Sequence, residues 1–172
     1  NIDATKTYRL STWVWRNKTG NGSFYFGGYG YDSAGTNIGL INRTSGAVDT
    51  NFYFTSSTGY PEAGRWELFV GHIWPVGSGT GSAHADSGRY TLNGAKVGTL
   101  TDCVFNTGSA KCAHRTYLYY CTDTTVRMQW VYPRVDICDG TEPSVESLIA
   151  GFDSDYIDFI REKGGTTNLP LN

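Results

Sequence analysis

The sequence predicts an all-β fold, an antiparallel β-sandwich with two short α-helices at its C-terminal end. Short segments in which apolar and polar residues alternate recur along most of the chain, and a period of two is typical of strands with one buried face. Turn-forming Gly, Asn, Ser and Thr residues separate these segments, as in sandwiches and barrels. Towards the C-terminus the apolar residues recur at helical spacing instead.

The strand predicted at residues 7–16 has two faces of different character. One face is apolar and suits a hydrophobic core, whereas the other carries Arg9, Ser11, Trp13 and Trp15. Two indoles are more apolar surface than a protein leaves in water without a reason. Either another layer of the fold covers this face, or it is a contact surface for a sugar or a partner protein.

The remaining strands follow in order along the chain. Their β-branched and aromatic residues place them at residues 23–31, 38–42, 51–55, 65–74, 89–92, 96–100, 114–122, 126–132 and 134–138. Pro75 ends the longest apolar run, and Asn93-Gly94 predicts a hairpin turn. The Gly/Ser-rich residues 76–87 predict a loop.

Two helices are predicted after the last strand. Pro143 suits the first turn of one helix, which residues 144–150 continue. A second helix is expected to begin at residue 153 or 154 and to end at Lys163, where a cation and two following glycines favour a helix C-terminus.

Length and charge indicate one domain without nucleic-acid or membrane contacts. A chain of 172 residues is long enough for a hydrophobic core, so we expect a single domain at residues 1–172 with extended tails at 1–6 and 166–172. The net charge is −2 and no Lys/Arg cluster occurs, which excludes the basic footprint of a nucleic-acid-binding protein. No apolar run reaches the length of a membrane span.

The four cysteines indicate an oxidising compartment. Their spacing favours the disulfides Cys103–Cys112 and Cys121–Cys138, with four buried free thiols as the alternative. No C-x-x-C motif occurs, so zinc is not expected.

Three glycosylation sequons also indicate an oxidising, extracellular compartment. They begin at Asn17, Asn21 and Asn42, in turn-like contexts, and predict N-glycosylation in a eukaryotic host. Together with the cysteines they predict an extracellular protein, at a cell or virion surface.

The titratable residues show no catalytic pattern. No G-x-S-x-G motif occurs, and His72, His84 and His114 are scattered along the chain. No spacing pairs two carboxylates as a glycosidase requires. We therefore expect a protein that is not an enzyme and that needs no cofactor. A structural calcium ion is the metal left open, since oxygen ligands occur at Asp139, Glu142, Asp153, Asp155 and Asp158, although helix capping explains the last three equally well.

Two sets of motifs carry a family resemblance. The segment KTYRLSTWVWR at residues 6–16 resembles the opening strand of jelly-roll carbohydrate-binding modules. Residues 65–74, the run RTYLYY from Arg115 and the segment from Tyr132-Pro to Asp139-Gly-Thr-Glu-Pro are similar to modules of virus tail fibres and large microbial surface proteins. Both resemblances imply a jelly-roll sandwich, and neither carries a catalytic signature.

Aromatic residues supply the candidate binding site. Pyranose rings stack their C–H faces on aromatic rings while flanking polar side chains bind the hydroxyls. Each candidate ring has the core, or a place under the C-terminal helices, as its alternative. The candidate contact residues are Trp13, Trp15, Tyr29, Tyr31, Trp74, Trp130, Arg9 and Gln129.

Two functions remain. The leading hypothesis is a non-catalytic, secreted structural module of a surface fibre, adhesin or tail-like appendage. It would contact copies of itself or adjacent domains through its tails and through Trp13 and Trp15. The alternative is a carbohydrate-binding module that uses the same aromatic face for glycans.

Overall fold

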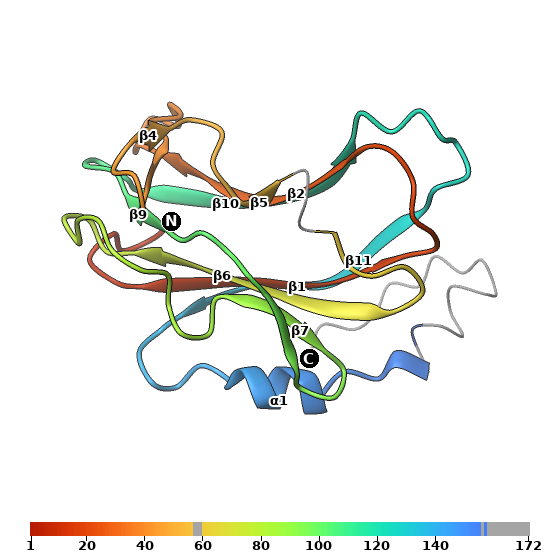
Figure 1. Cartoon of the computed structure of the whole chain (residues 1–172). Coiled ribbons are helices and arrows are strands. Elements are labelled where there is room, and N and C mark those ends of the chain that lie inside the picture. The colour runs from red at the N-terminus through yellow and green to blue at the C-terminus, as the bar shows by residue number, and fades with distance from the viewer. Residues whose placement is uncertain (57–59, 156, 158–172) are drawn as a thin grey trace.

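The computed structural model describes residues 1–56, 60–155 and 157, and strands dominate it (Figure 1). The one helix of more than a turn in the described part is α1 (Val145–Ala150). The strands are β1 (Tyr8–Arg16), β2 (Ser23–Tyr31), β3 (Leu40–Asn42), β4 (Val48–Asp49), β5 (Tyr53–Ser56), β6 (Trp66–Trp74), β7 (Gly88–Thr91), β8 (Lys96–Thr99), β9 (Cys103–Phe105), β10 (Lys111–Tyr119) and β11 (Met128–Ile137).

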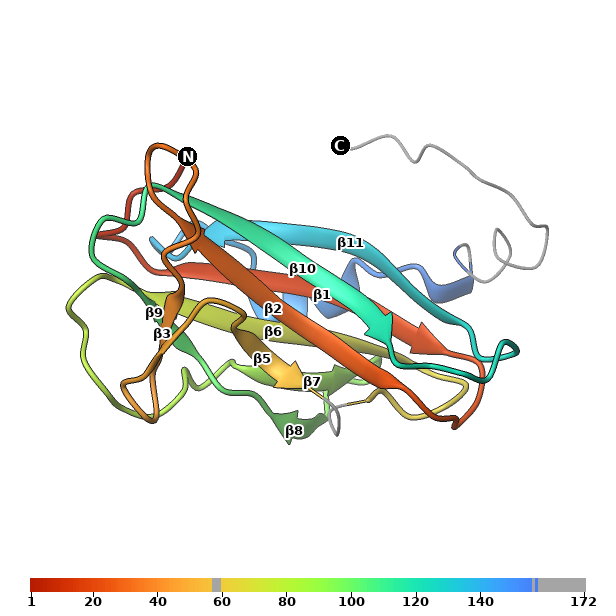
Figure 2. The ribbon, with the colours of Figure 1, turned by 90° about the horizontal axis from the view of Figure 1, so that it is seen from above.

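The strands form two sheets that face each other, a β-sandwich-like arrangement (Figures 1 and 2). Sheet A has the order β11-β1-β6-β9-β3-β4, with β7 beside β6 and β8 beside β7. Sheet B has the order β10-β2-β5. All pairings are antiparallel except that of β6 with β9, so sheet A is mixed.

The main core lies between the sheets and consists largely of phenylalanine. Phe24 and Phe26 of β2 point inward and meet Phe69 of β6 at ring-centroid distances of 5.1 and 6.1 Å. Leu10 and Val14 of β1 are fully buried in the same core. Alternation therefore placed the apolar face of β1 correctly.

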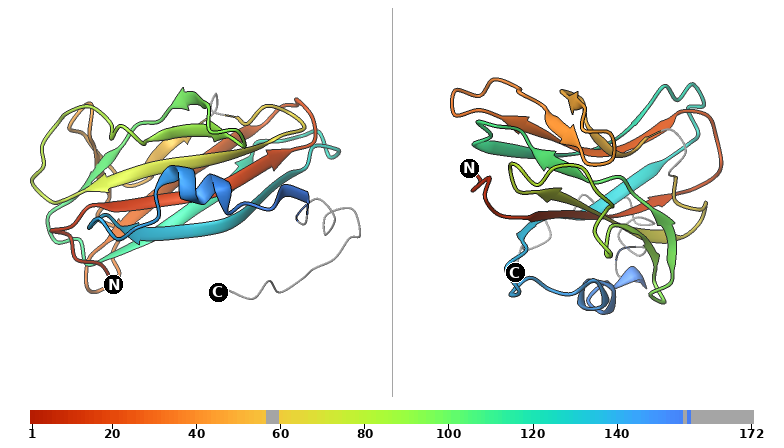
Figure 3. Two further views of the ribbon diagram at one scale, coloured as in Figure 1. Left: turned by 90° about the horizontal axis from the view of Figure 1, so that it is seen from below. Right: turned by 60° about the vertical axis from the view of Figure 1, so that its left-hand side comes forward.

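A second core covers the outer face of sheet A. Helix α1 and the segment after it pack on this face, as Figure 3 shows from below. The ring of Phe152 stacks on Trp13 with centroids 4.1 Å apart, and Trp13 is only 2% exposed. Trp13 is thus a core residue and not a contact surface, because the chain supplies its own covering layer.

Strand β11 joins two strands that were predicted separately. Pro133 was expected to divide them, but β11 lies at the edge of sheet A, where a residue without an N–H is tolerated. Two steps along β1, from Ser11 to Trp13, correspond to three along β11, from Arg134 to Val131. This bulge contains Tyr132, whose φ is 52°, and it accommodates the proline.

The other predicted strands occur close to their expected bounds, and β2 coincides with residues 23–31. The turn at Asn93-Gly94 joins β7 to β8, with Gly94 at a φ of 84°. Strands β4 and β9 were not predicted, because two or three residues are too few to show alternation.

The first predicted helix is confirmed and the second is not shown. Helix α1 begins after Ser144, whose Oγ accepts a hydrogen bond from Ser147 N at 3.1 Å, so Pro143 precedes the cap. Most of the second predicted helix and the tail at 166–172 lie outside the described residues.

The N-terminal tail is bound to the rest of the domain by backbone hydrogen bonds. Ile2 N donates to Ala110 O at 2.9 Å, and Val76 N donates to Ala4 O at 2.8 Å. Ile2 and Ala4 also pack against the core between the sheets. The expectation of an extended tail is replaced by a short turn between Asp3 and Lys6.

The four cysteines are free, so neither predicted disulfide occurs in the structure. Cys121 and Cys138 lie beyond opposite ends of the ten-residue strand β11. That strand is roughly 30 Å long, whereas a disulfide needs Cα atoms within about 7 Å. Cys103 and Cys112 belong to facing sheets and remain thiols whose pKa burial raises, and only Cys103 is fully buried.

Trp13→Ala is expected to lower the free energy of unfolding by about 3–5 kcal/mol, because it removes a buried indole and leaves a cavity under Phe152. The matched control is Trp130→Ala on β11, where the side chain is 42% exposed and the loss should be much smaller. Urea denaturation measures both. Equal losses in the two variants would contradict this account of the outer face of sheet A.

Candidate functional site

An exposed aromatic surface lies on the outer face of sheet B. We call it the tyrosine face; it comprises Tyr25, Tyr29, Tyr31, Tyr53, Tyr117 and Tyr119 with Arg115 and Asn51. The side chains of these eight residues are half-buried or exposed, and Tyr119 is 54% exposed. None of the described elements packs over it, in contrast to sheet A (Figure 1).

Strand alternation produces this surface. In β2, Phe24 and Phe26 point into the core, so Tyr25 points outward. In β10, the register pairs Tyr117 with Tyr25 and Arg115 with Gly27, which places the two β10 residues on the same outer side. The signal was present in the sequence, since SFYFGGYGY and NFYFT place phenylalanine on one face and tyrosine on the other.

The rings form a row along the sheet that consists of two groups in ring contact. Tyr25 stacks on Tyr117 with centroids 5.0 Å apart and an interplanar angle of 17°. Tyr25 also lies 4.6 Å from Tyr53, and Tyr117 lies 6.2 Å from Tyr119. At the other end of β2, Tyr29 and Tyr31 are 5.7 Å apart.

Arg115 connects the two ends of this row. Its guanidinium lies 3.8 Å from the ring centroid of Tyr29, 4.7 Å from that of Tyr53 and 5.2 Å from that of Tyr117. Such distances are favourable cation–π contacts. One cation thus contacts one phenol ring from each of the three strands of sheet B.

A hydrogen-bond network fixes the centre of the face. Arg115 donates from NH1 to Asn51 Oδ1 at 2.5 Å and from NH2 to the hydroxyls of Tyr53 and Tyr117 at 2.9 Å each. The Tyr53 hydroxyl donates to Asn51 Oδ1 at 2.9 Å and also contacts the Tyr117 hydroxyl. One consistent assignment has Tyr117 donating to Tyr53, which holds both rings in one orientation.

Burial raises the pKa of Tyr117 above its ordinary range, and the hydrogen bond with Tyr53 raises it further. The phenol therefore stays protonated and neutral near pH 7.

Gly27 makes room for the neighbouring ring, because a Cβ there would lie 2.2 Å from Phe52 O and 2.9 Å from Cδ1 of Tyr53.

The predicted contact residues are distributed over several parts of the molecule. Tyr29 and Tyr31 belong to the tyrosine face, whereas Trp13 and Trp15 lie on the outer side of sheet A. Trp15 is partly buried, 6.4 Å from the ring of Trp66.

The remaining predicted contact residues do not form a common surface. Gln129 and Trp130 lie on the edge strand β11. Arg9 is 3% exposed and forms an ion pair with Asp136 at 2.9 Å. Trp74 donates its indole N–H to Asp102 at 2.9 Å and lies under the guanidinium of Arg43, at one end of the sandwich.

The sequon asparagines all take part in local hydrogen bonds. Asn17 Nδ2 donates to Thr125 O at 2.9 Å, and Asn21 Nδ2 donates to the Thr122 hydroxyl. Asn42 accepts from two backbone amides through its side-chain oxygen. Each Nδ2 has a second N–H besides the one in these bonds, and glycosylation stays a prediction.

Three buried residues have the composition of a catalytic triad but not its connectivity. The Ser87 hydroxyl donates to Asp102 Oδ1 at 2.5 Å and contacts His72 Nδ1 at 2.7 Å. In a triad the histidine stands between serine and carboxylate, whereas here the serine does. All three are at most 2% exposed, so a substrate cannot reach them. The network is therefore structural.

Asp102 is the centre of that network. Its two oxygens accept hydrogen bonds from His72 N, His84 N, the Ser87 hydroxyl and the Trp74 indole. The ring of His84 stacks on that of His72 with centroids 4.1 Å apart. The loop after β6 is thereby tied to the beginning of β9.

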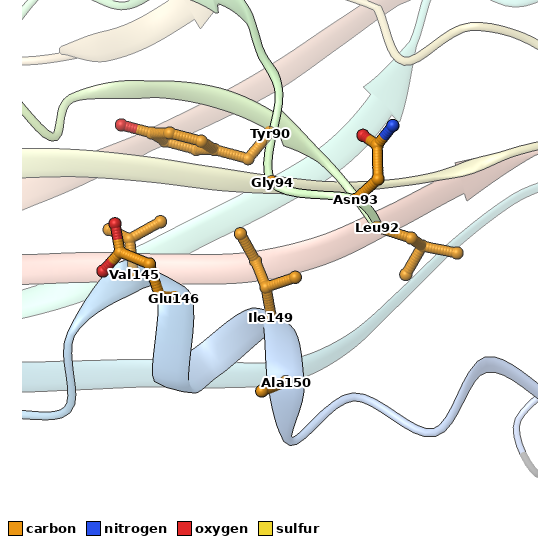
Figure 4. Close-up of a pocket in the computed structure, with 8 residues that line it drawn as sticks. All are labelled: Tyr90, Leu92, Asn93, Gly94, Val145, Glu146, Ile149 and Ala150. Atoms are coloured by element: carbon orange, nitrogen blue, oxygen red, sulfur yellow. The ribbon is translucent and has the colours of Figure 1, made fainter.

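A small groove separates the β7–β8 hairpin from α1 (Figure 4). Tyr90 and Leu92 face Val145 and Ile149 across it. Its polar groups already have partners, since the Tyr90 hydroxyl donates to Asp86 O at 3.0 Å. The groove is the seam between the helix and sheet A, and it lacks the convergent polar groups of a ligand site.

The described residues contain neither a metal-binding cluster nor a membrane-spanning helix. Within the described residues, no group of three or more His, Cys, Asp or Glu side chains could hold a metal ion. Asp139 and Glu142 accept hydrogen bonds within one turn, and Asp158 lies outside the described residues. None of the described helices is long and apolar enough to cross a membrane.

Comparison of the chain with protein families, with curated proteins and with solved structures gives no match. The site therefore has to be interpreted from its own geometry. That geometry singles out the tyrosine face, which combines exposure, aromatic rings and fixed polar groups.

Stability is expected to decrease as the pH falls below 6.5. Burial lowers the pKa of His72 from 6.5 to about 3, and the basic groups of His84, Arg9 and Lys96 act in the same direction. Between these values the unfolded chain binds a proton that the folded chain excludes. Folding stability is therefore lost with falling pH, at up to about 1.4 kcal/mol per pH unit.

His72→Gln should reduce this dependence, because glutamine keeps a polar side chain without titrating. Urea unfolding at several pH values between 7 and 4 measures the slope in both proteins. A part of the slope should remain in the variant, since burial also lowers the pKa of His114. Identical slopes would contradict the assignment to His72.

Proposed function

We propose that this protein is a non-catalytic carbohydrate-binding module with a jelly-roll-type sandwich, and that it binds a glycan on the tyrosine face. The observation that supports this most is the row of half-buried and exposed tyrosine rings on the outer face of sheet B. Phenol rings present flat apolar surfaces of the size of a pyranose ring, with a polar edge for the sugar hydroxyls.

The rigidity of the face supports the same proposal. The rings of Tyr53 and Tyr117 are locked by Arg115 and Asn51, so they lose little conformational freedom when a ligand stacks on them. A sugar surface needs this preorganisation, because each stacking contact is weak.

The surrounding loops also suit a ligand of limited length. The segment that carries β4 and the segment between β10 and β11 rise beyond sheet B at its two ends (Figure 1). Between them the row runs from Tyr31 to Tyr119 and is several rings long. A short stretch of polysaccharide lying along β2 fits this arrangement better than a single sugar.

Tyr25→Ala is expected to weaken glycan binding by about tenfold, because it removes the ring between Tyr53 and Tyr117. A glycan array followed by calorimetry with the best ligand measures the loss. Trp130→Ala, on the other sheet, serves as the control and should bind normally. Failure of the wild-type protein to bind any glycan would overturn the proposal.

A structural role in an assembly is the second candidate, and one observation favours it. Trp130, Val135 and Ile137 of β11 are 42, 47 and 43% exposed. They pair with core residues of β1, so they point towards the side of sheet A that sheet B covers elsewhere. Sheet B ends there with β10, which runs beside β11 in Figure 2.

This apolar strip between two sheet edges suits strand addition by a second copy of the chain. The subunit contacts predicted from the sequence support assembly less well, since Trp13 is buried and residues 1–6 are bound to their own domain. Under this second proposal, Trp130→Glu should convert a self-associating protein into a monomer in analytical ultracentrifugation. Tyr25→Ala should leave association unchanged. A wild-type protein that is monomeric at high concentration excludes self-assembly.

A further inference from the structure

We propose that the glycan is acidic, and that Arg115 binds a carboxylate of a uronic-acid polysaccharide at the centre of the tyrosine face. This inference rests on the proposed carbohydrate-binding function and specifies its ligand class. It comes from the charge on the face, which a neutral sugar does not require.

The charge of Arg115 has no carboxylate partner within its own sheet. Strands β2, β5 and β10 contain Lys111 and Arg115 but no Asp or Glu. None of the ion pairs found in the described part of the chain includes Arg115. The other arginines of strands β1 and β7, by contrast, lie near Asp136 or Glu67.

The acidic residues of the adjoining loops are engaged locally. Asp32 accepts from Thr36 N at 2.8 Å, and Asp49 accepts from Asn51 N at 2.7 Å. Asp123 forms an ion pair with Lys18 at 2.9 Å. These carboxylates stabilise turns, and the cation in the centre of sheet B keeps its net charge.

The guanidinium also retains donors for a ligand. Arg115 is only half-buried, and its three hydrogen bonds leave two of the five N–H groups of a guanidinium without a partner among the described residues. A ligand carboxylate can accept a charge-assisted hydrogen bond from one of these remaining N–H groups. The rings of Tyr29 and Tyr53 hold the guanidinium in place, so a carboxylate would meet a preorganised cation flanked by stacking surfaces for the sugar rings.

The competing explanation is that Arg115 only braces the phenol rings. In that case its removal would loosen Tyr53 and Tyr117 and weaken the binding of neutral and acidic sugars equally. A salt-bridging arginine would instead affect acidic sugars selectively. The two explanations therefore differ in ligand preference and not in affinity alone.

The test compares oligogalacturonates with their carboxyl-reduced counterparts, which have the same ring geometry without the charge. Calorimetry is carried out on the wild-type protein, on Arg115→Gln and on Arg115→Lys. Lys111→Gln serves as the matched control, since it removes the other cation of β10 at the end of the face. Thermal unfolding establishes that each variant is folded.

We expect the wild-type protein to prefer the acidic ligand by about tenfold or more at low salt, and added NaCl to reduce that preference. Arg115→Gln should weaken both ligands, because Arg115 also holds the rings of Tyr53 and Tyr117, but it should weaken the acidic ligand more and so remove the preference. Arg115→Lys should keep part of the preference, and Lys111→Gln all of it. If Arg115→Gln does not fold, the salt dependence of the wild-type preference decides in its place.

Four results would overturn the inference. Equal binding of both ligands by the wild-type protein leaves the carbohydrate-binding proposal intact but removes the acidic preference. Equal loss of both ligands in a folded Arg115→Gln variant assigns the arginine a bracing role. Binding of neither ligand, while the array yields a different glycan, rejects the uronate, and no binding to any glycan rejects the proposed function itself.

Discussion

The stacking of Phe152 on Trp13 closes the outer face of sheet A, and the different roles of the two sheets depend on it. Sheet A has an apolar residue on each side of β1 and β6, so it needs a covering layer on both faces. Sheet B supplies one layer, and α1 with the following segment supplies the other. Because α1 and Phe152 pack on sheet A, none of the described elements covers the outer face of sheet B.

Buried polar groups fix the ends of this arrangement. Asp102 is 1% exposed and accepts four hydrogen bonds, which offset the cost of removing a carboxylate from water. Glu67 is fully buried near the opposite end of β6 and pairs with Arg65 at 2.8 Å. These groups make the loops around sheet A part of one cooperative structure, and they leave the tyrosine face as the exposed surface that is both aromatic and ordered.

The tyrosine face differs from an ordinary solvated sheet surface in its internal order. Asn51 accepts bonds from Arg115 and Tyr53, and these two contact Tyr117 in turn. Hydrogen-bonded rings on a paired strand have few alternative rotamers. A ligand that stacks on them meets a surface that is already in its bound arrangement, which is the physical basis for the functions proposed above.

Much of the fold was accessible from the sequence, and the site was only partly so. Alternation predicted the long strands and the core face of β1, because strand period and burial are local properties. The same alternation also indicates the tyrosine face, because Tyr25 and Tyr29 alternate with buried residues in β2. Of the tyrosines on this face, however, only Tyr29 and Tyr31 were predicted as contact residues. Alternation could not decide which of two aromatic faces is exposed. Trp13 and Tyr25 both lie on a strand face opposite the core. Trp13 is buried because a segment distant in the chain packs on it, whereas no described element covers the face that carries Tyr25.

The sequence by itself determined that this protein is built from strands with two unlike faces and that the face of residues 7–16 with Trp13 and Trp15 needs a cover or a partner. The tertiary structure decided which aromatics are covered, because coverage depends on where the C-terminal segment packs. It also decided that Cys121 and Cys138 lie beyond opposite ends of β11 and that Arg115 stands among three tyrosines from different strands. Pairing across strands is a long-range property, and the register that creates it is absent from any local pattern.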